Sequence, residues 1–241
     1  MFSPLEIDSA KIVDLTYSLD EKTVHWPDEP AFQHERLFWG ATPEGYFYAS
    51  GRFATAEHVG THMDGPIHFA EGQFPVDEVP VSQLIGPAVV VDVSASCASD
   101  ANFRVTVADL SAWENTHGAI PAGAMVLFHT GWGRYWGDAK KYLGLSDQNP
   151  SQMHFPGIGA EAASALAGRH PRLVGIDTAS IDYGQSQDYP VHRIVCPAGI
   201  CALENIAHLE LLPATGAILI ALPIKIRGGS GAPARVIAIL P

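Results

Sequence analysis

Residues 58–68, with the sequence HVGTHMDGPIH, bring three histidines and one aspartate together within eleven residues. Imidazole and carboxylate groups together suit a divalent ion such as zinc or manganese. The stretch differs from the helical metalloprotease motif because Val59, rather than glutamate, follows the first histidine. Gly60, Gly65 and Pro66 also disfavour a helix. We therefore predict an extended segment that binds metal.

The spacing within this segment limits how its side chains can meet. His58, His62 and Asp64 are separated by even numbers of residues, so a strand would direct all three to one face. At about 3.3 Å per residue, a straight strand would hold the α-carbons of His58 and Asp64 roughly 20 Å apart. Either the chain bends near Gly60, or two ions share the ligands. The turn after Asp64 would let His68 face the site from another side.

Length and composition predict one globular domain over residues 1–241. Of the 241 residues 47% are hydrophobic, and no composition shift, repeat or low-complexity run marks a linker. A formal net charge of -12 disfavours a nucleic-acid partner. The longest apolar runs have the length of strands, so we expect no membrane partner or membrane span.

Cysteine usage and the first residues point to the cytoplasm. Cys97, Cys196 and Cys201 form an odd set with no paired framework, which is typical of buried free thiols in a reducing compartment. Metal binding by Cys196 and Cys201 is the alternative. The first ten residues contain Glu6 and Asp8 and lack an apolar signal core, so we expect no export.

Alternating strand and helix patterns predict an α/β domain. Because strands outnumber helices, we expect a mixed, partly barrel-like sheet. The stretch 134–156 has mixed polarity and receives no assignment. The predicted strands are 11–19, 52–64, 88–93, 125–130, 173–177, 217–226 and 236–240; the predicted helices run from Thr106 to about His117 and from Gly157 or Gly159 to near Gly168.

Aromatic residues are concentrated in the first fifty positions. Trp26 lies in a proline-punctuated loop and is the candidate substrate contact. The aromatic residues that follow it would form either a hydrophobic flap over the core or a wall for a flat substrate; they are Phe32, Phe38, Trp39, Tyr46, Phe47 and Tyr48.

A second candidate cluster consists of His192 and Glu204, twelve residues apart. Glu204 lies in an apolar context, and a buried carboxylate needs a partner. A metal ion or a histidine would supply one, and a salt bridge to Arg193 is the alternative.

Several stretches together resemble the bacterial cyclase family, whose members include kynurenine formamidases and isatin hydrolases. They are HVGTHMDGPIHF, the early DLTYSL with WPD after it, GIDTASIDYG, PVH, ALEN and the tail LPIKIRGGSGAPARVIAI. The resemblance runs over most of the chain. It implies a swivelling β/β/α fold, assembly into homodimers or larger homo-oligomers, and substrate pockets near the subunit interface.

The resemblance also implies a metal site built from both clusters. His58, His62 and Asp64 match the family's metal ligands. In its two-zinc members the aspartate bridges, and a histidine and a glutamate spaced like His192 and Glu204 hold the second ion. The expected cofactor is therefore one or two divalent ions, Mn²⁺ or Zn²⁺.

Catalytic roles follow from the same match. His68 corresponds to the family's acid/base histidine, and the GGSGAP tail, which is similar to that of the isatin hydrolases, would place Ser230 beside the site. The serine is not part of a G-x-S-x-G nucleophile elbow, because Gly229 stands directly before it. The chain is longer than compact formamidases, chiefly around 134–156.

We expect a hydrolase that cleaves the C–N bond of a small aryl amide with metal-activated water, as in the opening of isatin to isatinate. The alternatives within the family are N-formylkynurenine, a lactone or another cyclic amide. A metal-stabilised binding protein and a metal-dependent lyase or true cyclase are the alternatives from other classes. An anionic substrate would need compensation from Lys225, Arg227 or Arg235.

Overall fold

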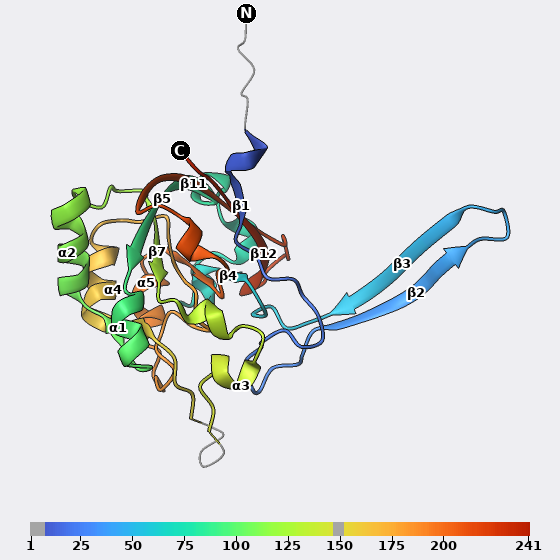
Figure 1. The fold of residues 1–241 in the computed structure, drawn as a ribbon, viewed down its shortest axis with the longest axis horizontal. Coiled ribbons are helices and arrows are strands. Elements are labelled where there is room, and N and C mark those ends of the chain that lie inside the picture. Colours follow the sequence, from blue (N-terminus) through green and yellow to red (C-terminus); the bar gives the residue numbers. More distant parts are fainter. Residues whose placement is uncertain (1–7, 147–151) are drawn as a thin grey trace, which may run out of the picture.

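A computed structural model describes residues 8–146 and 152–241 (Figure 1). An eight-stranded sheet forms its centre, built from β1 Ile12–Asp14, β4 His62–Asp64, β5 Ile85–Asp92, β7 Met125–His129, β9 Leu173–Ile176, β10 Cys201–Glu204, β11 Thr215–Pro223 and β12 Gly231–Ile239. The order is β1-β12-β11-β5-β7-β9-β10-β4, and β4 pairs with β12 as well as β10. That additional pairing closes the sheet into a barrel, with β1 attached outside the ring.

The sheet is mixed, as the sequence predicts. Strands β5, β7, β9 and β10 are parallel to their neighbours in this group, whereas the pairings made by β11, β12 and β4 are antiparallel. The α/β class and the partly barrel-like sheet are both confirmed.

Residues of β5 alternate between two apolar environments. Val90 belongs to a core cluster with members on every strand of the ring, which places it inside the barrel, while Val89 and Val91 belong to a cluster shared with the helices. The helices therefore cover one outer face of the sheet, as Figure 1 shows. They are α1 Ser94–Ser99, α2 Val107–His117, α4 Ala160–Ala167 and α5 His192–Val195.

The two predicted helices are confirmed. Thr106 caps α2 in a capping box with Asp109, and Gly118 follows the last residue with a φ of 88°. The second predicted helix is α4, with Gly159 as its N-cap. The unassigned stretch contains α3 Ala139–Tyr142, and part of it, 147–151, lies outside the described residues. Two short strands, β6 Arg104–Val105 and β8 Gly157–Ile158, pair with each other.

The prediction of one strand over 52–64 is wrong. Strand β3 Phe47–Ala54 ends at Ala54, and β4 begins at His62. Gly60 adopts a φ of 58°, a left-handed conformation that turns the chain between the two strands. The predicted bend near Gly60 is therefore confirmed, and His58 reaches the site from a loop.

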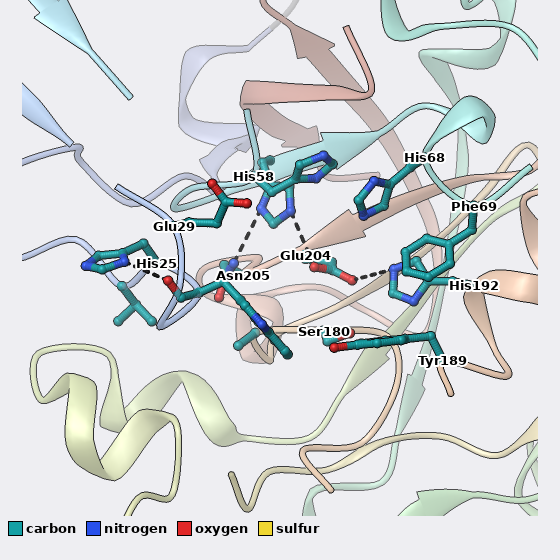
Figure 2. Close-up of a pocket in the computed structure, with 14 residues that line it drawn as sticks. His25, Glu29, His58, His68, Phe69, Ser180, Tyr189, His192, Glu204 and Asn205 are labelled. Atoms are coloured by element: carbon teal, nitrogen blue, oxygen red, sulfur yellow. Dashed lines mark hydrogen bonds and ion pairs between the residues drawn. The ribbon is translucent and has the colours of Figure 1, made fainter. Parts of the chain in front are cut away.

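Both interpretations of the early aromatic residues are wrong for five of the six. Strand β2 Gln33–Ala41 pairs with β3 in a hairpin that extends away from the barrel (Figure 1). Phe32 is buried at the base of this hairpin. The others, Phe38, Trp39, Tyr46, Phe47 and Tyr48, are 40–64% exposed, and none is among the described residues that line the cavity of Figure 2.

Two further sequence predictions concern the whole molecule. Cys97, Cys196 and Cys201 are buried free thiols, as predicted. Among the described residues no helix is long and apolar enough to cross a membrane. The single-domain assignment for residues 1–241 stays a prediction.

Candidate active site

The site lies on the outer face of the barrel, where β4 and β10 are neighbours. Met63 and Leu203 point into the barrel, so the residues beside them in each strand face outward. His62 lies opposite Glu204 in the antiparallel register. Its Nε2 is 3.3 Å from Asp64 Oδ1 and 3.3 Å from Glu204 Oε2. The two predicted clusters are therefore one site.

His192 approaches the same two carboxylates from the other side. It begins α5, and its Nε2 lies 3.3 Å from Asp64 Oδ2 and 3.3 Å from Glu204 Oε1. Each carboxylate thus presents one oxygen to His62 and the other to His192. Figure 2 shows Glu204 between the histidine rings. The alternative salt bridge is wrong, because the Arg193 guanidinium donates to the backbone oxygen of Asp188 instead.

His58 and His68 complete the cluster. His58 Nδ1 is 2.7 Å from Asp64 Oδ1, and the rings of His58 and His68 stack with centroids 3.9 Å apart. The 3-10 turn at Pro66–His68 directs His68 back towards the cavity, as the sequence predicts. Ligand atoms of His58, Asp64 and His68 lie within 4.8 Å of one another, and so do those of His62, Asp64 and Glu204.

The donor set fits a divalent metal. Two ligands of a tetrahedral ion, each about 2.0–2.2 Å from it, lie roughly 3.3–3.6 Å apart, which matches the four distances of 3.3 Å that His62 and His192 make with Asp64 and Glu204. His62 Nε2 is buried and has no hydrogen-bond partner of good geometry among the described residues, although two carboxylate oxygens surround it. An imidazole nitrogen held this way is placed to coordinate an ion.

The two buried carboxylates of the cluster stabilise positive charge on the histidines beside them. Burial alone would lower the pKa of His62, but its contacts with Asp64 and Glu204 raise the pKa to about 10. Burial would also lower the pKa of His192, yet Asp182 and the same two carboxylates raise it well above its usual range. Burial opposes ionisation of Asp64, but the neighbouring histidines keep its pKa well below its usual range. The histidines therefore neutralise two buried carboxylates when no metal is bound.

His68 behaves differently from these two histidines. Burial lowers the pKa of His68 to about 4, against the opposing attraction of Asp64. The difference arises because the His68 ring is enclosed but has no direct carboxylate partner such as His62 and His192 have. At neutral pH the His68 ring is uncharged and able to accept a proton.

Residues that orient the histidines are the main omission of the sequence analysis. Asp182 Oδ2 accepts a 2.7 Å hydrogen bond from His192 Nδ1, which fixes the tautomer with Nε2 facing the carboxylates. The backbone oxygen of Gly60 plays the same part for His62 Nδ1, at 2.9 Å, and also accepts from Asn205 Nδ2. Asp182 lies in the GIDTASIDYG stretch, where a carboxylate ten residues before a candidate ligand was the available signal.

Ser230 lies behind His58. Its Oγ is 2.9 Å from His58 Nε2 and donates a 2.6 Å hydrogen bond to Glu57 Oε2. Ser230 is not among the described residues that line the cavity, so its position suits a role through His58 rather than direct contact with a product. Gly231 makes this packing possible, because a Cβ there would lie 2.4 Å from His58 Cε1.

The cluster opens into a cavity of about 230 Å³ with aromatic walls. Trp26 lines it, as predicted, together with Phe69 and Tyr189. The Trp26 and Tyr189 rings are 6.3 Å apart, and those of Phe69 and Tyr189 are 5.3 Å apart. Figure 2 shows Phe69 and Tyr189 on the side of the cavity where His192 lies.

The expected cationic compensation is absent from this cavity. Among the described residues that line it, none is Lys225, Arg227 or Arg235. Arg235 instead forms an exposed ion pair with Asp14, 2.7 Å between Nη2 and Oδ2. Lys225, Arg227 and Arg235 are all exposed, so the predicted compensation is not found among the described residues of this cavity.

The sequence of this chain is similar to those of known proteins. The family described as putative cyclase matches residues 13–183. The chain belongs to the cyclase family. An isatin hydrolase from Roseibium aggregatum is 34% identical over 82% of this chain and 77% of that protein. A kynurenine formamidase from Salinibacter ruber is 30% identical over 94% of this chain and 96% of that protein.

Solved structures show the same fold. Isatin hydrolase A from Labrenzia aggregata, bound to benzyl benzoate, matches with a TM-score of 0.86 and 35% identity, over 95% of this chain and 93% of that one. An isatin hydrolase bound to the product analogue thioisatinate matches with a TM-score of 0.88 and 31% identity, over 96% and 92%. The swivelling β/β/α fold implied by the resemblance is confirmed.

Asp182 offers a test of the metal site that leaves every proposed ligand in place. We expect Asp182→Asn to weaken zinc or manganese binding by about 10–100-fold, because His192 loses the charged group that orients it. Calorimetric titration of metal into the metal-free protein measures the change. Asp188→Asn, at an exposed aspartate nearby, is the matched control. Unchanged affinity in a folded Asp182→Asn variant would show that this contact does not support the site.

Proposed function

We propose that this protein is a metal-dependent amidohydrolase that opens isatin to isatinate. The observation that carries the proposal is the convergence of His58, His62, Asp64, His192 and Glu204 at the base of one aromatic-walled cavity. The similarity to isatin hydrolases in sequence and fold supports this substrate in particular. Trp26, with Phe69 and Tyr189, would contact the aryl ring.

The proposed metal ligands are the five residues at the base of the cavity, with Asp64 shared if two ions bind. Imidazole and carboxylate donors suit Zn²⁺ or Mn²⁺. When bound, such an ion lowers the pKa of water from 15.7 to about 7 and polarises a carbonyl group.

His68 is the proposed acid/base residue. It lines the cavity, and its lowered pKa keeps the ring uncharged at neutral pH, so it can accept a proton from the attacking water. Hydrolysis forms one C–O bond and breaks the C–N bond. His68 then passes its proton to the leaving nitrogen, a transfer that its low basicity favours. Ser230 would relay protons between His58 and Glu57.

Kynurenine formamidase activity is the second candidate. The formamidase from Salinibacter ruber aligns over nearly the full length of both chains, and the same donor set would hydrolyse a formamide. A lactone or another small cyclic amide would be attacked in the same way.

The decisive experiment combines metal content with turnover. We expect the purified protein to contain zinc or manganese, to open isatin in an absorbance assay, to lose this activity after chelation and to regain it when the ion is restored. Release of formate from N-formylkynurenine without isatin opening would favour the second candidate. A metal-bound protein inactive towards amides and lactones would favour a binding protein. Activity that survives complete metal removal would contradict both hydrolase candidates.

Replacement of His68 separates acid/base chemistry from metal binding. We expect His68→Ala to lower kcat by roughly 10²–10⁴-fold, because the substitution removes the proposed general acid and base. Elemental analysis of the same sample should show unchanged metal content. His208→Ala, at an exposed histidine outside this cavity, is the control. Loss of metal in His68→Ala would assign the residue to the ligands, and full activity with full occupancy would remove it from the mechanism.

We also propose a homodimer or larger homo-oligomer in which the β2–β3 hairpin contacts another copy. An exposed apolar surface of this kind is typical of an interaction site. It includes Leu37, Trp39, Phe47 and Phe53, which are all more than half exposed. The buried free thiols suit the reducing cytoplasm, which is the proposed location.

Light scattering tests the role of the hairpin. We expect the wild-type protein to have at least twice the mass of one chain, and Trp39→Ser with Phe47→Ser to reduce that mass, because the substitutions remove apolar contact area. Val81→Ser, at another exposed apolar residue, should leave the mass unchanged. A monomeric wild-type protein at all concentrations would contradict the assembly.

A further inference from the structure

Glu29 places a carboxylate on the wall of the proposed substrate cavity. It belongs to the proline-punctuated loop that carries Trp26, and its backbone N–H donates a 2.9 Å hydrogen bond to the Trp26 carbonyl. The turn that holds the aromatic wall therefore also fixes the start of the Glu29 side chain. Figure 2 shows this side chain on the same side of the cavity as His25.

The cavity has no lysine or arginine side chain among its described residues to balance this charge. Among the described residues that line it, none is lysine or arginine, and the acidic ones are Glu29 and Glu204. Glu204 is buried between His62 and His192 and accepts a hydrogen bond from the backbone of Ile181. Glu29 is exposed and has no ion pair with the described residues. The charge of Glu204 is thus neutralised within the protein, whereas the charge of Glu29 remains available to act on a substrate.

We propose that Glu29 is a specificity-determining residue that makes this cavity favour uncharged or cationic aryl amides over anionic ones of the same size. The substrate class that follows rests on the proposed function. Because Glu29 is exposed and Glu204 is buried, Glu29 acts on the part of the substrate nearer to solvent, and the metal-binding cluster acts on the reacting carbonyl. Hydrolysis of an uncharged amide at neutral pH produces a carboxylate, so the same charge disfavours rebinding of the product.

The test uses a pair of probes that differ in charge but hardly in size: isatin-5-sulfonamide, which is neutral, and isatin-5-sulfonate, which is anionic. For each probe, turnover and calorimetric affinity are measured with the metal-loaded wild-type protein and with Glu29→Gln. We expect the wild-type protein to prefer the sulfonamide by about fivefold in kcat/KM, because Glu29 is exposed and two like charges about 4 Å apart in water would give an effect of this size. We expect Glu29→Gln to bring this ratio close to one, with the change mainly in KM.

Two controls separate this effect from a change in folding. Glu161→Gln removes the same charge from an exposed residue in the first turn of α4, which does not line this cavity, and should change the ratio by less than about twofold. High salt should reduce the wild-type preference and have little effect on the Glu29→Gln ratio, because screening acts only where a charge contributes. A purely structural role for Glu29 would change both probes equally and give no such salt dependence.

The outcomes distinguish this inference from the proposed function. Hydrolysis of both probes with a ratio that Glu29→Gln leaves unchanged overturns the specificity role and retains the hydrolase. Binding without hydrolysis, with a charge preference that disappears in Glu29→Gln, supports the role of Glu29 and overturns the amidohydrolase. A wild-type protein that binds and hydrolyses neither probe overturns both.

Discussion

Two buried carboxylates that share two histidines are the constraint on which the rest of this structure depends. Asp64 and Glu204 are almost fully enclosed, and burial of an unpaired carboxylate would cost several kcal/mol. His62 and His192 supply positive charge in the metal-free protein, and a divalent ion would replace their protons. A buried charge cluster of this kind is weak support for stability. We interpret it as a feature retained for chemistry.

The closed barrel is what makes this cluster possible. Strand β4 has only three residues, yet it pairs with both β10 and β12, which fixes His62 and Asp64 from two sides. The pairing with β10 sets Glu204 directly across from His62. Gly231, on β12, leaves the space that the His58 ring occupies. Of the proposed ligands, His62, Asp64 and Glu204 therefore come from strands, His58 comes from the loop before β4, and His192 comes from the short helix α5.

The cavity walls have a different origin from its base. Trp26, Glu29 and Tyr189 come from connecting segments between the strands, and the orienting Asp182 follows β9 in such a segment. Loops on a rigid scaffold are where substrate selection can vary without disturbing the core. This division fits a chain that is similar to both isatin hydrolases and kynurenine formamidases, which act on different substrates.

The sequence by itself determined the elements with strong local signals: the capped helix from Thr106, the continuous apolar strands and the dense group of histidine and aspartate residues around His62. It also predicted a bend at Gly60 as one of two ways to bring these side chains together. These depend on spacing, capping and backbone sterics, which act over a few residues. Only the tertiary structure decided that His192 and Glu204 join that motif by geometry, that Asp182 orients His192, and that the early aromatic residues lie on a projecting hairpin. Each of these depends on which distant segments become neighbours when the sheet closes, and no local pattern specifies that pairing.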